Sequence, residues 1–303
     1  MMEKFLGVDV GGTNVKFGCV STDGKLTKKK KFKTADLGEG ANFLPNFIKL
    51  IGKELNENAS IKKVGMGIPG TLTKDRRIIL ETPNVSQLNG LHLMDALEEA
   101  FPDKKFHLEN DANAAALGEL YFSPEHLPDN FIFITLGTGI GGAAIMDRQI
   151  FKGGDGNSME VGHIISSHGI TVEQKIGKKG LVNMTFHELS QYTGVSVLTE
   201  KLPLTSKLLE KAAENGDELA IKVFTEMGVI LGEALVSVIR ILDIKTVVIG
   251  GGVADNYDNL VKSMYKSLDK FLTPYYLKDL HIKKASLGND AGIIGAASLG
   301  FID

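Results

Sequence analysis

Apolar runs that end in glycine-rich turns are the main feature of the sequence pattern. Residues 5–9 form such a run and end in an aspartate, a Gly-Gly-Thr turn follows at residues 11–13, and residues 15–20 carry apolar side chains at alternating positions. A period of two is typical of β-strands, so this segment predicts a hairpin and not a strand-to-helix phosphate loop. The same plan returns at residues 131–146, which indicates two similar halves that each offer a turn to one nucleotide.

Helical periodicity lies between and after these hairpins. From residue 42 to residue 56 the apolar positions recur every three or four residues, as on a helix face that packs on a sheet. We expect further helices at residues 93–100 and 218–242, and a small-residue helix that opens near residue 289. With 303 residues, 43% of them hydrophobic, the chain is long enough for two packed domains.

Three other segments suit a ligand or simple turn chemistry. Residues 64–70 end in Gly-Ile-Pro-Gly, which leaves the backbone unobstructed and either lines a ligand cleft or only marks the exit of a strand. Residues 247–253 contain three consecutive glycines, which could lie flat against adenine or serve a tight strand-to-helix turn. Asn84 follows Thr-Pro, where its amide suits a sugar hydroxyl or an ordinary turn.

Asp111 begins an alanine-rich helix directly after the strand-like residues 106–109. A carboxylate at a helix N-terminus is stabilised by free backbone N–H groups and by the helix dipole, so Asp111 could be only a cap worth about 1 kcal/mol. The other interpretation is a catalytic base. The glycine-rich turns elsewhere in the chain suggest a site for ATP and a hydroxyl acceptor, and they favour the base.

Asp9 stands at the end of the first strand, beside the Gly-Gly-Thr turn. Glycines at a hairpin tip let backbone N–H groups approach phosphate oxygens, and Asp9 could hold Mg²⁺ directly or through water. An ordinary hairpin with an acidic edge fits the same residues. The lysine-rich residues 28–33 follow, and we expect them on a solvated edge strand and assign them no ligand.

Composition narrows the function classes. A net charge of -3 and a pI near 6.2 give no general attraction to nucleic acid or to an anionic membrane, so small-molecule chemistry is expected. Cys19 is the only cysteine, which excludes an intrachain disulfide and fits a reducing compartment. The first residues lack a signal-peptide pattern, and charged residues interrupt the most apolar long segment, 229–242, so we expect a cytoplasmic protein.

Four motifs, in this order and at these spacings, resemble those of the ROK (repressor, open reading frame, kinase) family of sugar kinases. They are Asp-x-Gly-Gly-Thr from residue 9, Glu-Asn-Asp-Ala-Asn-Ala-Ala-Ala from residue 109, Leu-Gly-Thr-Gly-Ile-Gly-Gly from residue 136 and Glu-Val-Gly-His from residue 160. The resemblance implies the actin-like ATPase (ribonuclease H-like) fold, with two α/β domains around a nucleotide cleft, and a homodimer. It places a small domain at residues 1–110, completed by the C-terminal helix at 289–303, and a large domain at residues 111–288.

The resemblance also implies a reaction, the ATP-dependent phosphorylation of the primary 6-hydroxyl of a hexose, with ATP and Mg²⁺ as cofactors. Asp111 would accept the hydroxyl proton, and a weak base suffices because the alcohol becomes acidic as its bond to phosphorus forms. The residues that would contact the sugar are Gly70, Asn84, Asn110, Asp111, Glu160 and His163. The residues that would hold ATP are Gly11, Gly12, Thr13, Thr138, Gly139, Gly251 and Gly252, and Asp9 would hold Mg²⁺.

The chain departs from this family just after His163. Family members carry a Cys-x-Cys-Gly-x-x-Gly-Cys-x-Glu zinc loop there, whereas residues 164–183 contain no cysteine and offer only His168 as a further ligand. Structural zinc needs four Cys or His ligands, so we expect no structural zinc and a loop held by apolar packing. The residues expected to pack it are Ile170, Val172, Ile176, Leu181 and Val182.

The altered loop bears on the choice of sugar. Asn183 falls where the family's second sugar-binding Glu would be. Glucose is favoured, and an N-acetylhexosamine, N-acetylmannosamine first, is the alternative because the loop lies where a 2-acetamido group would sit. Polyphosphate could replace ATP as donor, and His163 could be a packed core histidine.

Two non-enzymatic functions fit the sequence less well. A sugar sensor without catalysis would more naturally have lost Asp111. A DNA-binding repressor would need a helix-turn-helix ahead of Asp9, where only eight residues stand. We therefore expect an enzyme without a nucleic-acid or membrane partner.

Overall fold

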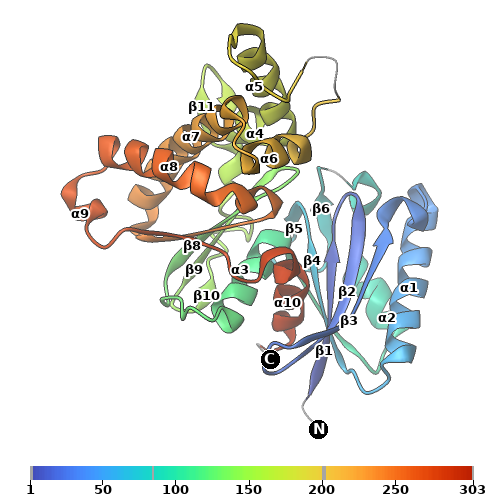
Figure 1. Cartoon of the computed structure of the whole chain (residues 1–303). Coiled ribbons are helices and arrows are strands. Elements are labelled where there is room, and N and C mark those ends of the chain that lie inside the picture. The colour runs from blue at the N-terminus through green and yellow to red at the C-terminus, as the bar shows by residue number, and fades with distance from the viewer. Residues whose placement is uncertain (1–2, 84, 200–202, 302–303) are drawn as a thin grey trace. The chain divides into compact units, whose positions relative to one another are not determined.

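The computed structural model describes residues 3–83, 85–199 and 203–301 (Figure 1). The contacts within the chain define two compact units. The first comprises Met1–Asp129, Ala143–Ser158 and Asn289–Asp303, and the second comprises Asn130–Gly142 and Met159–Gly288. Across the described ranges, no helix has the length and apolar character needed to cross a membrane.

A five-stranded sheet forms the centre of the first unit, with its strands in the order β3-β2-β1-β4-β7. β2 is antiparallel to both β1 and β3, whereas β1, β4 and β7 run parallel. The strands are β1 (Lys4–Val10), β2 (Asn14–Ser21), β3 (Leu26–Lys33), β4 (Lys63–Ile68) and β7 (Lys105–Asn110). The predicted hairpin is β1–β2, and the lysine-rich segment is the edge strand β3, so both predictions are confirmed.

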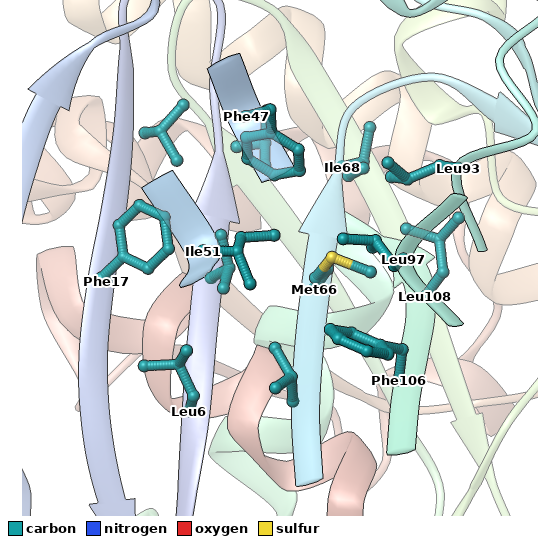
Figure 2. Packing of buried hydrophobic residues seen from close by; sticks show 14 of the residues in the cluster. Leu6, Phe17, Phe47, Ile51, Met66, Ile68, Leu93, Leu97, Phe106 and Leu108 are labelled. Atoms are coloured by element: carbon teal, nitrogen blue, oxygen red, sulfur yellow. The ribbon is translucent and has the colours of Figure 1, made fainter. Parts of the chain in front are cut away.

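Large apolar side chains cover one face of this sheet and pack against α1 (Phe43–Glu57) and α2 (Leu93–Ala100). Leu6, Phe17 and Met66 from the strands lie in one cluster with Phe47 and Ile51 of α1 (Figure 2). Full burial of such side chains contributes roughly 1.5–3 kcal/mol each. This cluster fixes the sheet whose strand ends carry the predicted site.

Glycines occupy the other face of the two central parallel strands. A Cβ on Gly7 of β1 or on Gly65 of β4 would come within 2.1 Å of the backbone of α10 (Ala291–Ser298). α3 (Asp111–Phe122) is equally close to α10, because a Cβ on Gly295 would come within 1.8 Å of its backbone. The alternation of apolar residues with glycine in β4 therefore builds a core face on one side and a helix-packing face on the other.

A second sheet has the strand order β10-β9-β8-β13-β14, in which β8, β13 and β14 run parallel. Its strands are β8 (Phe131–Leu136), β9 (Ile140–Met146), β10 (Gln149–Ile150), β13 (Thr246–Gly250) and β14 (His281–Lys284). β8 and β9 are the second predicted hairpin. Two small sheets complete the strands: β5 (Thr71–Leu72) pairs with β6 (Ile79–Glu81), and β11 (Ile165–Ser167) pairs with β12 (Ile170–Thr171).

The helices of the second unit are α4 (Val172–Ile176), α5 (Lys178–Gln191), α6 (Ser206–Glu214), α7 (Glu218–Leu242), α8 (Tyr257–Phe271) and α9 (Pro274–Leu277). α7 is the long helix that the sequence predicts at residues 218–242. It packs closely on α8, where Cβ atoms on Gly228 and Gly232 would come within 2.1 and 2.8 Å of α8 atoms.

The first unit is larger than the predicted small domain, which ends at residue 110. α3 belongs to the first unit because it packs on α10, and residues 143–158 belong to it as well. The catalytic candidate Asp111 therefore lies in the first unit.

Candidate active site

The carboxyl ends of β1, β4 and β7 bring three predicted site segments to one edge of the first sheet. These parallel strands are in register, with Asp9 opposite Gly67 and Gly67 opposite Glu109. The first glycine turn, the turn at Gly70 and the start of α3 all follow this edge. Asn110 Nδ2 donates a hydrogen bond to Gly70 O at 3.1 Å, which joins two of the predicted sugar contacts directly.

Asn110, and not Asp111, caps α3. Its Oδ1 accepts hydrogen bonds from the N–H groups of Ala112 at 2.9 Å and Asn113 at 3.2 Å, which is N-cap geometry. Asp111 is the first residue of the helix and is partly exposed, and its Oδ1 accepts a hydrogen bond from Ala112 N at 2.9 Å. The simple capping role considered for Asp111 therefore belongs to its neighbour.

Asp9 has a cation of the chain itself as a partner. Lys16 Nζ lies 2.8 Å from Asp9 Oδ2, and the carboxylate packs on the start of α10, where a Cβ on Gly292 would come within 2.8 Å of it. In the described ranges, no three or more His, Cys, Asp or Glu side chains form a group that could hold a metal ion. Mg²⁺ that is bound together with nucleotide phosphates usually has only one or two protein carboxylates as ligands. A single carboxylate such as Asp9 is therefore compatible with a Mg²⁺ ligand.

The tip of the first hairpin is held by its own backbone and by Thr34. Gly11 N donates to Asn14 O at 2.9 Å, while the hydroxyl and N–H of Thr34 donate to Gly11 O at 2.6 Å and Thr13 O at 3.0 Å. No hydrogen bond in the described part of the chain uses the N–H of Gly12 or Thr13. The N–H of Gly11 already bonds to Asn14 O. Of the residues predicted to bind phosphate at this tip, only Gly12 and Thr13 therefore stay candidates as backbone donors.

Glu173 and Lys178 secure the tip of the second hairpin. Glu173 Oε2 accepts a hydrogen bond from Ile140 N at 2.8 Å, and Lys178 N donates to Thr138 O at 3.2 Å. A Cβ on Gly139 would come within 2.3 Å of Glu173 Oε2, so the packing of Glu173 explains this glycine. As far as the described residues go, the N–H groups of Thr138 and Gly139 take part in no hydrogen bond, so both stay candidates as phosphate donors.

The third glycine turn lies beside the second hairpin, at the carboxyl ends of the parallel strands β13 and β8. Gly251 has a φ of 87°, and a Cβ on it would come within 2.3 Å of Leu136 O, so the turn itself requires this glycine. Gly252 and Gly137 differ, because their φ angles are outside the left-handed region and a Cβ on either would meet no described atom within 4 Å. Neither packing nor backbone conformation requires glycine at these two positions.

Glu160 and His163 form a pair in the second unit, with Glu160 Oε2 3.1 Å from His163 Nδ1. The His163 side chain is 65% exposed, so the alternative of a packed core histidine is wrong. Met159 precedes the pair with a φ of 70°, a left-handed conformation that is uncommon for a residue with a side chain. Local strain of this kind is often retained where it orients a functional residue.

Apolar residues hold the segment that stands where the family has its zinc loop. Val172, Ile176 and Leu181 are buried, as predicted. Ile170 was expected to join them, but it is 42% exposed because it lies in the short β12 strand at the surface. Val182 is half-buried, and Asn183 is exposed on α5.

The predicted residues thus fall into one group in each unit. The first unit holds Asp9, Gly11, Gly12, Thr13, Gly70, Asn110 and Asp111, and the second holds Thr138, Gly139, Glu160, His163, Gly251 and Gly252. Asn84 lies outside the described residues.

Sequence reasoning missed three charged residues that contact these groups. Lys16 could have been found, because the register of a tight hairpin places it opposite Asp9. Arg76 pairs with buried Glu109, and Glu173 bonds to Ile140 of the second hairpin, and in each case the two partners are 33 positions apart in the sequence. No local pattern signals such long-range pairs.

The ROK family model matches residues 5–301 of the chain. The glucokinase of Halalkalibacterium halodurans is 30% identical over 316 residues, a match that covers 97% of this chain and 94% of that protein. The N-acetylmannosamine kinase of Yersinia pestis (strain Pestoides F) is 26% identical over 299 residues and 98% of each chain.

Solved structures share the fold. A candidate sugar kinase from Cytophaga hutchinsonii superposes with a TM-score of 0.91 at 37% identity, covering 98% of this chain and 99% of that one. A ROK family glucokinase from Streptomyces griseus, in complex with glucose and AMPPNP, superposes with a TM-score of 0.81 at 28% identity over 98% of each chain. ROK sugar kinases have the actin-like ATPase fold, so the predicted α/β fold class is confirmed.

Proposed function

We propose that this chain, which belongs to the ROK family and is an ATP-dependent sugar kinase, phosphorylates the primary 6-hydroxyl of a hexose and prefers glucose. The division of roles at the start of α3 carries the proposal. Asn110 caps the helix, so Asp111 stands in the first turn without being the cap. A carboxylate that the helix does not need as its cap, beside a turn expected to contact sugar, fits the role of general base.

Phosphoryl transfer mainly requires positioning and stabilisation of charge. The N–H groups expected to bear the phosphates are those of Gly12, Thr13, Thr138 and Gly139, and the open turn at Gly252 would receive adenine. Mg²⁺, when bound with ATP near Asp9, would neutralise part of the phosphate charge. Asp111 would hold the acceptor hydroxyl and take its proton late, as the bond from oxygen to phosphorus forms.

The proposed sugar contacts are Gly70, Asn84, Asn110, Glu160 and His163. Glucose is favoured by the 30% identity to a glucokinase over nearly the whole chain. The exposed Asn183 on α5 supports the alternative, an N-acetylhexosamine and N-acetylmannosamine first, because the altered loop would accommodate a 2-acetamido group. We also propose a cytoplasmic homodimer, on the family resemblance.

A coupled assay of ADP formation across a panel of sugars tests this function. We expect kcat/KM for glucose to exceed that for N-acetylmannosamine by at least tenfold with ATP as donor. The opposite order would establish the alternative substrate, and faster turnover with polyphosphate would change the donor. Sugar binding by calorimetry without any turnover would instead identify a sugar sensor.

A further inference from the structure

Glu109 is a buried carboxylate one residue before the cap of α3 and two residues before Asp111. Its side chain is only 2% exposed, and two N–H groups, the Arg76 guanidinium and the Lys152 ammonium bond to it or pair with it. Within its own segment, Oε1 accepts hydrogen bonds from Asn110 N at 3.0 Å and from Asn113 Nδ2 at 3.1 Å. The carboxylate therefore clamps the first turn of the helix that carries the proposed base.

Arg76 supplies the main positive charge. It meets Glu109 side-on, with Nε 3.1 Å from Oε2 and Nη2 3.0 Å from Oε1, and its side chain is 9% exposed. Arg76 also has a φ of 61°, in the left-handed region where residues with side chains are uncommon. The hairpin β5–β6 thus holds a strained backbone that directs a guanidinium into the buried cluster.

The same guanidinium contacts the loop of residues 152–158, which is followed directly by Met159 and Glu160. Arg76 Nη2 donates to Gly156 O at 2.5 Å, and Gly156 has a φ of 98° and leaves no room for a Cβ beside Nη1. Lys152 of this loop adds a second cation 3.3 Å from Glu109 Oε2.

Asn157 ties this loop to the hairpin a second time. Its amide accepts a hydrogen bond from Leu72 N at 2.9 Å and donates one to Leu72 O at 2.8 Å. Three segments far apart in the sequence are therefore joined at Glu109: the β5–β6 hairpin, the start of α3 and the loop that leads to Glu160.

We propose that Arg76 and Glu109 are a positioning pair, which holds Asn110 and Asp111 in the orientation that transfer to the sugar requires. The inference rests on the proposed function. A buried ion pair is seldom the most stable filling for a core site, because the cost of desolvating two charges offsets most of their attraction. A pair that also bonds to the cap residue and to two loops can instead contribute to the geometry of the site. Such a contribution matters because small displacements of a catalytic group lower the rate by large factors.

Four variants separate positioning from stability: Arg76→Met, Glu109→Met, the double variant and Arg77→Met. Arg77 is the matched control, because it neighbours Arg76 and pairs with Asp95 and Glu98 but is 38% exposed. Arg76→Met removes the main countercharge of Glu109, which then keeps Lys152, and Glu109→Met leaves the buried Arg76 without its carboxylate, so each single variant should lower the melting temperature. The double variant removes both charges and should recover part of the loss, although Asn110 N and Asn113 Nδ2 lose an acceptor in it. We expect kcat to stay at least tenfold below wild type in the double variant, with KM for ATP within threefold, and Arg77→Met to stay within twofold.

Recovery of kcat together with stability in the double variant would overturn the proposal, because the pair would then be only structural. If the double variant does not fold, Arg76→Lys provides the test, because lysine keeps the positive charge but cannot make the two-point contact with Glu109. It should reduce kcat at least fivefold while lowering the melting temperature less than Arg76→Met does, and an unchanged kcat would also overturn the proposal.

Hydrogen exchange of the peptide spanning residues 108–116 should be faster in Arg76→Lys than in Arg77→Met. This readout does not depend on turnover, so it distinguishes failure of the pair from failure of the proposed kinase function.

Discussion

Asn110 and Asp111 are neighbours of similar size with different tasks. Asn and Asp are both favoured N-caps, and helix boundaries read from sequence are uncertain by a residue or two, so the pattern could not decide which of them caps α3. Two hydrogen bonds to Asn110 Oδ1 settle this point. What the sequence did predict is that a carboxylate stands in the first turn, and its role as base stays a prediction.

Replacement of Asp111 by Asn tests that role. We expect kcat to fall by at least a thousandfold while sugar affinity stays within about tenfold, because the amide keeps the size and much of the hydrogen bonding but cannot accept a proton. Steady-state kinetics and sugar binding on the folded variant are the measurements. Asp129→Asn is the control, since Asp129 pairs with Arg148 at the surface, and it should change kcat less than twofold. If Asp111→Asn keeps kcat within a few-fold of wild type, Asp111 is not the base.

Replacement of Gly139 by Val should weaken ATP binding far more than sugar binding. The physical reason differs from simple blockage of phosphate, because the new Cβ would meet Glu173 Oε2 and displace the acceptor of the Ile140 N–H. Glu173→Ala is the matched variant, since it removes that acceptor and adds no bulk. We expect it to reproduce part of the loss when ATP and sugar affinities are measured separately. Equal losses for both ligands in Gly139→Val would indicate general misfolding instead.

Residues that act through distant partners were beyond sequence reasoning. The register of a hairpin is local, so the pairing of Lys16 with Asp9 was accessible in principle. Arg76 offered no such signal, because its contact with Glu109 depends on how a short hairpin folds against a strand end. Its left-handed backbone is likewise a property of the tertiary structure that composition does not reveal.

At the scale of elements, the apolar patterns predicted the strands of the first sheet and the helices α1, α2, α3, α7 and α10, and burial explains why. β4 alternates apolar residues with glycine, and the two sets face the α1 side and the α10 side of the sheet respectively. The α7 helix occupies the predicted residues because Asp217 caps it and its apolar positions are buried. The exposed Ile170 is the exception, since a two-residue strand at the surface offers no core for its side chain.

Because the carboxylate of Asp217 caps α7, the stability of the folded chain depends on pH in the acid range. Partial burial acts to raise the pKa of Asp217, but hydrogen bonds from Ala220 N, Val197 N and the Ser196 hydroxyl outweigh it and hold the pKa below its ordinary value. A carboxyl whose pKa is lower in the folded chain stabilises it above the unfolded pKa of about 4. That contribution is lost as the pH falls from there through the folded pKa.

Asp217→Ala should therefore lower the free energy of unfolding by about 1 kcal/mol at pH 7, and the difference from wild type should shrink well below pH 4. Urea unfolding at the two pH values measures it. Asp217→Asn is the control, because its neutral amide oxygen can still cap α7 and should keep most of the stability at both pH values. A difference between Asp217→Ala and wild type that is the same at both pH values would contradict the assignment of this pH dependence to Asp217.

For the whole molecule, the sequence predicted two glycine hairpins in two α/β halves, but the division of the chain was harder to foresee. The boundary at residue 110 is what the resemblance to the ROK family implies. The structure instead assigns α3 and residues 143–158 to the first unit. Residues 143–158 belong to the first unit through contacts such as those of Gly156 and Asn157 with the β5–β6 hairpin. These contacts join residues about 80 positions apart, so the sequence pattern does not reveal them.

The last prediction concerns the metal content of the whole protein. We expect the purified, active protein to contain no zinc and to be unaffected by chelators when Mg²⁺ is in excess, because Val172, Ile176 and Leu181 are buried in the segment where the family has its zinc loop. Each buried aliphatic side chain contributes roughly 1.5–3 kcal/mol, which can replace part of what a metal contributes to folding. Leu181→Ala should accordingly cost about 2–5 kcal/mol of unfolding free energy, and added zinc should not restore it. The test is elemental analysis of protein that has never met a nickel or zinc column, and one zinc per chain with activity lost on its removal would refute this account of the loop.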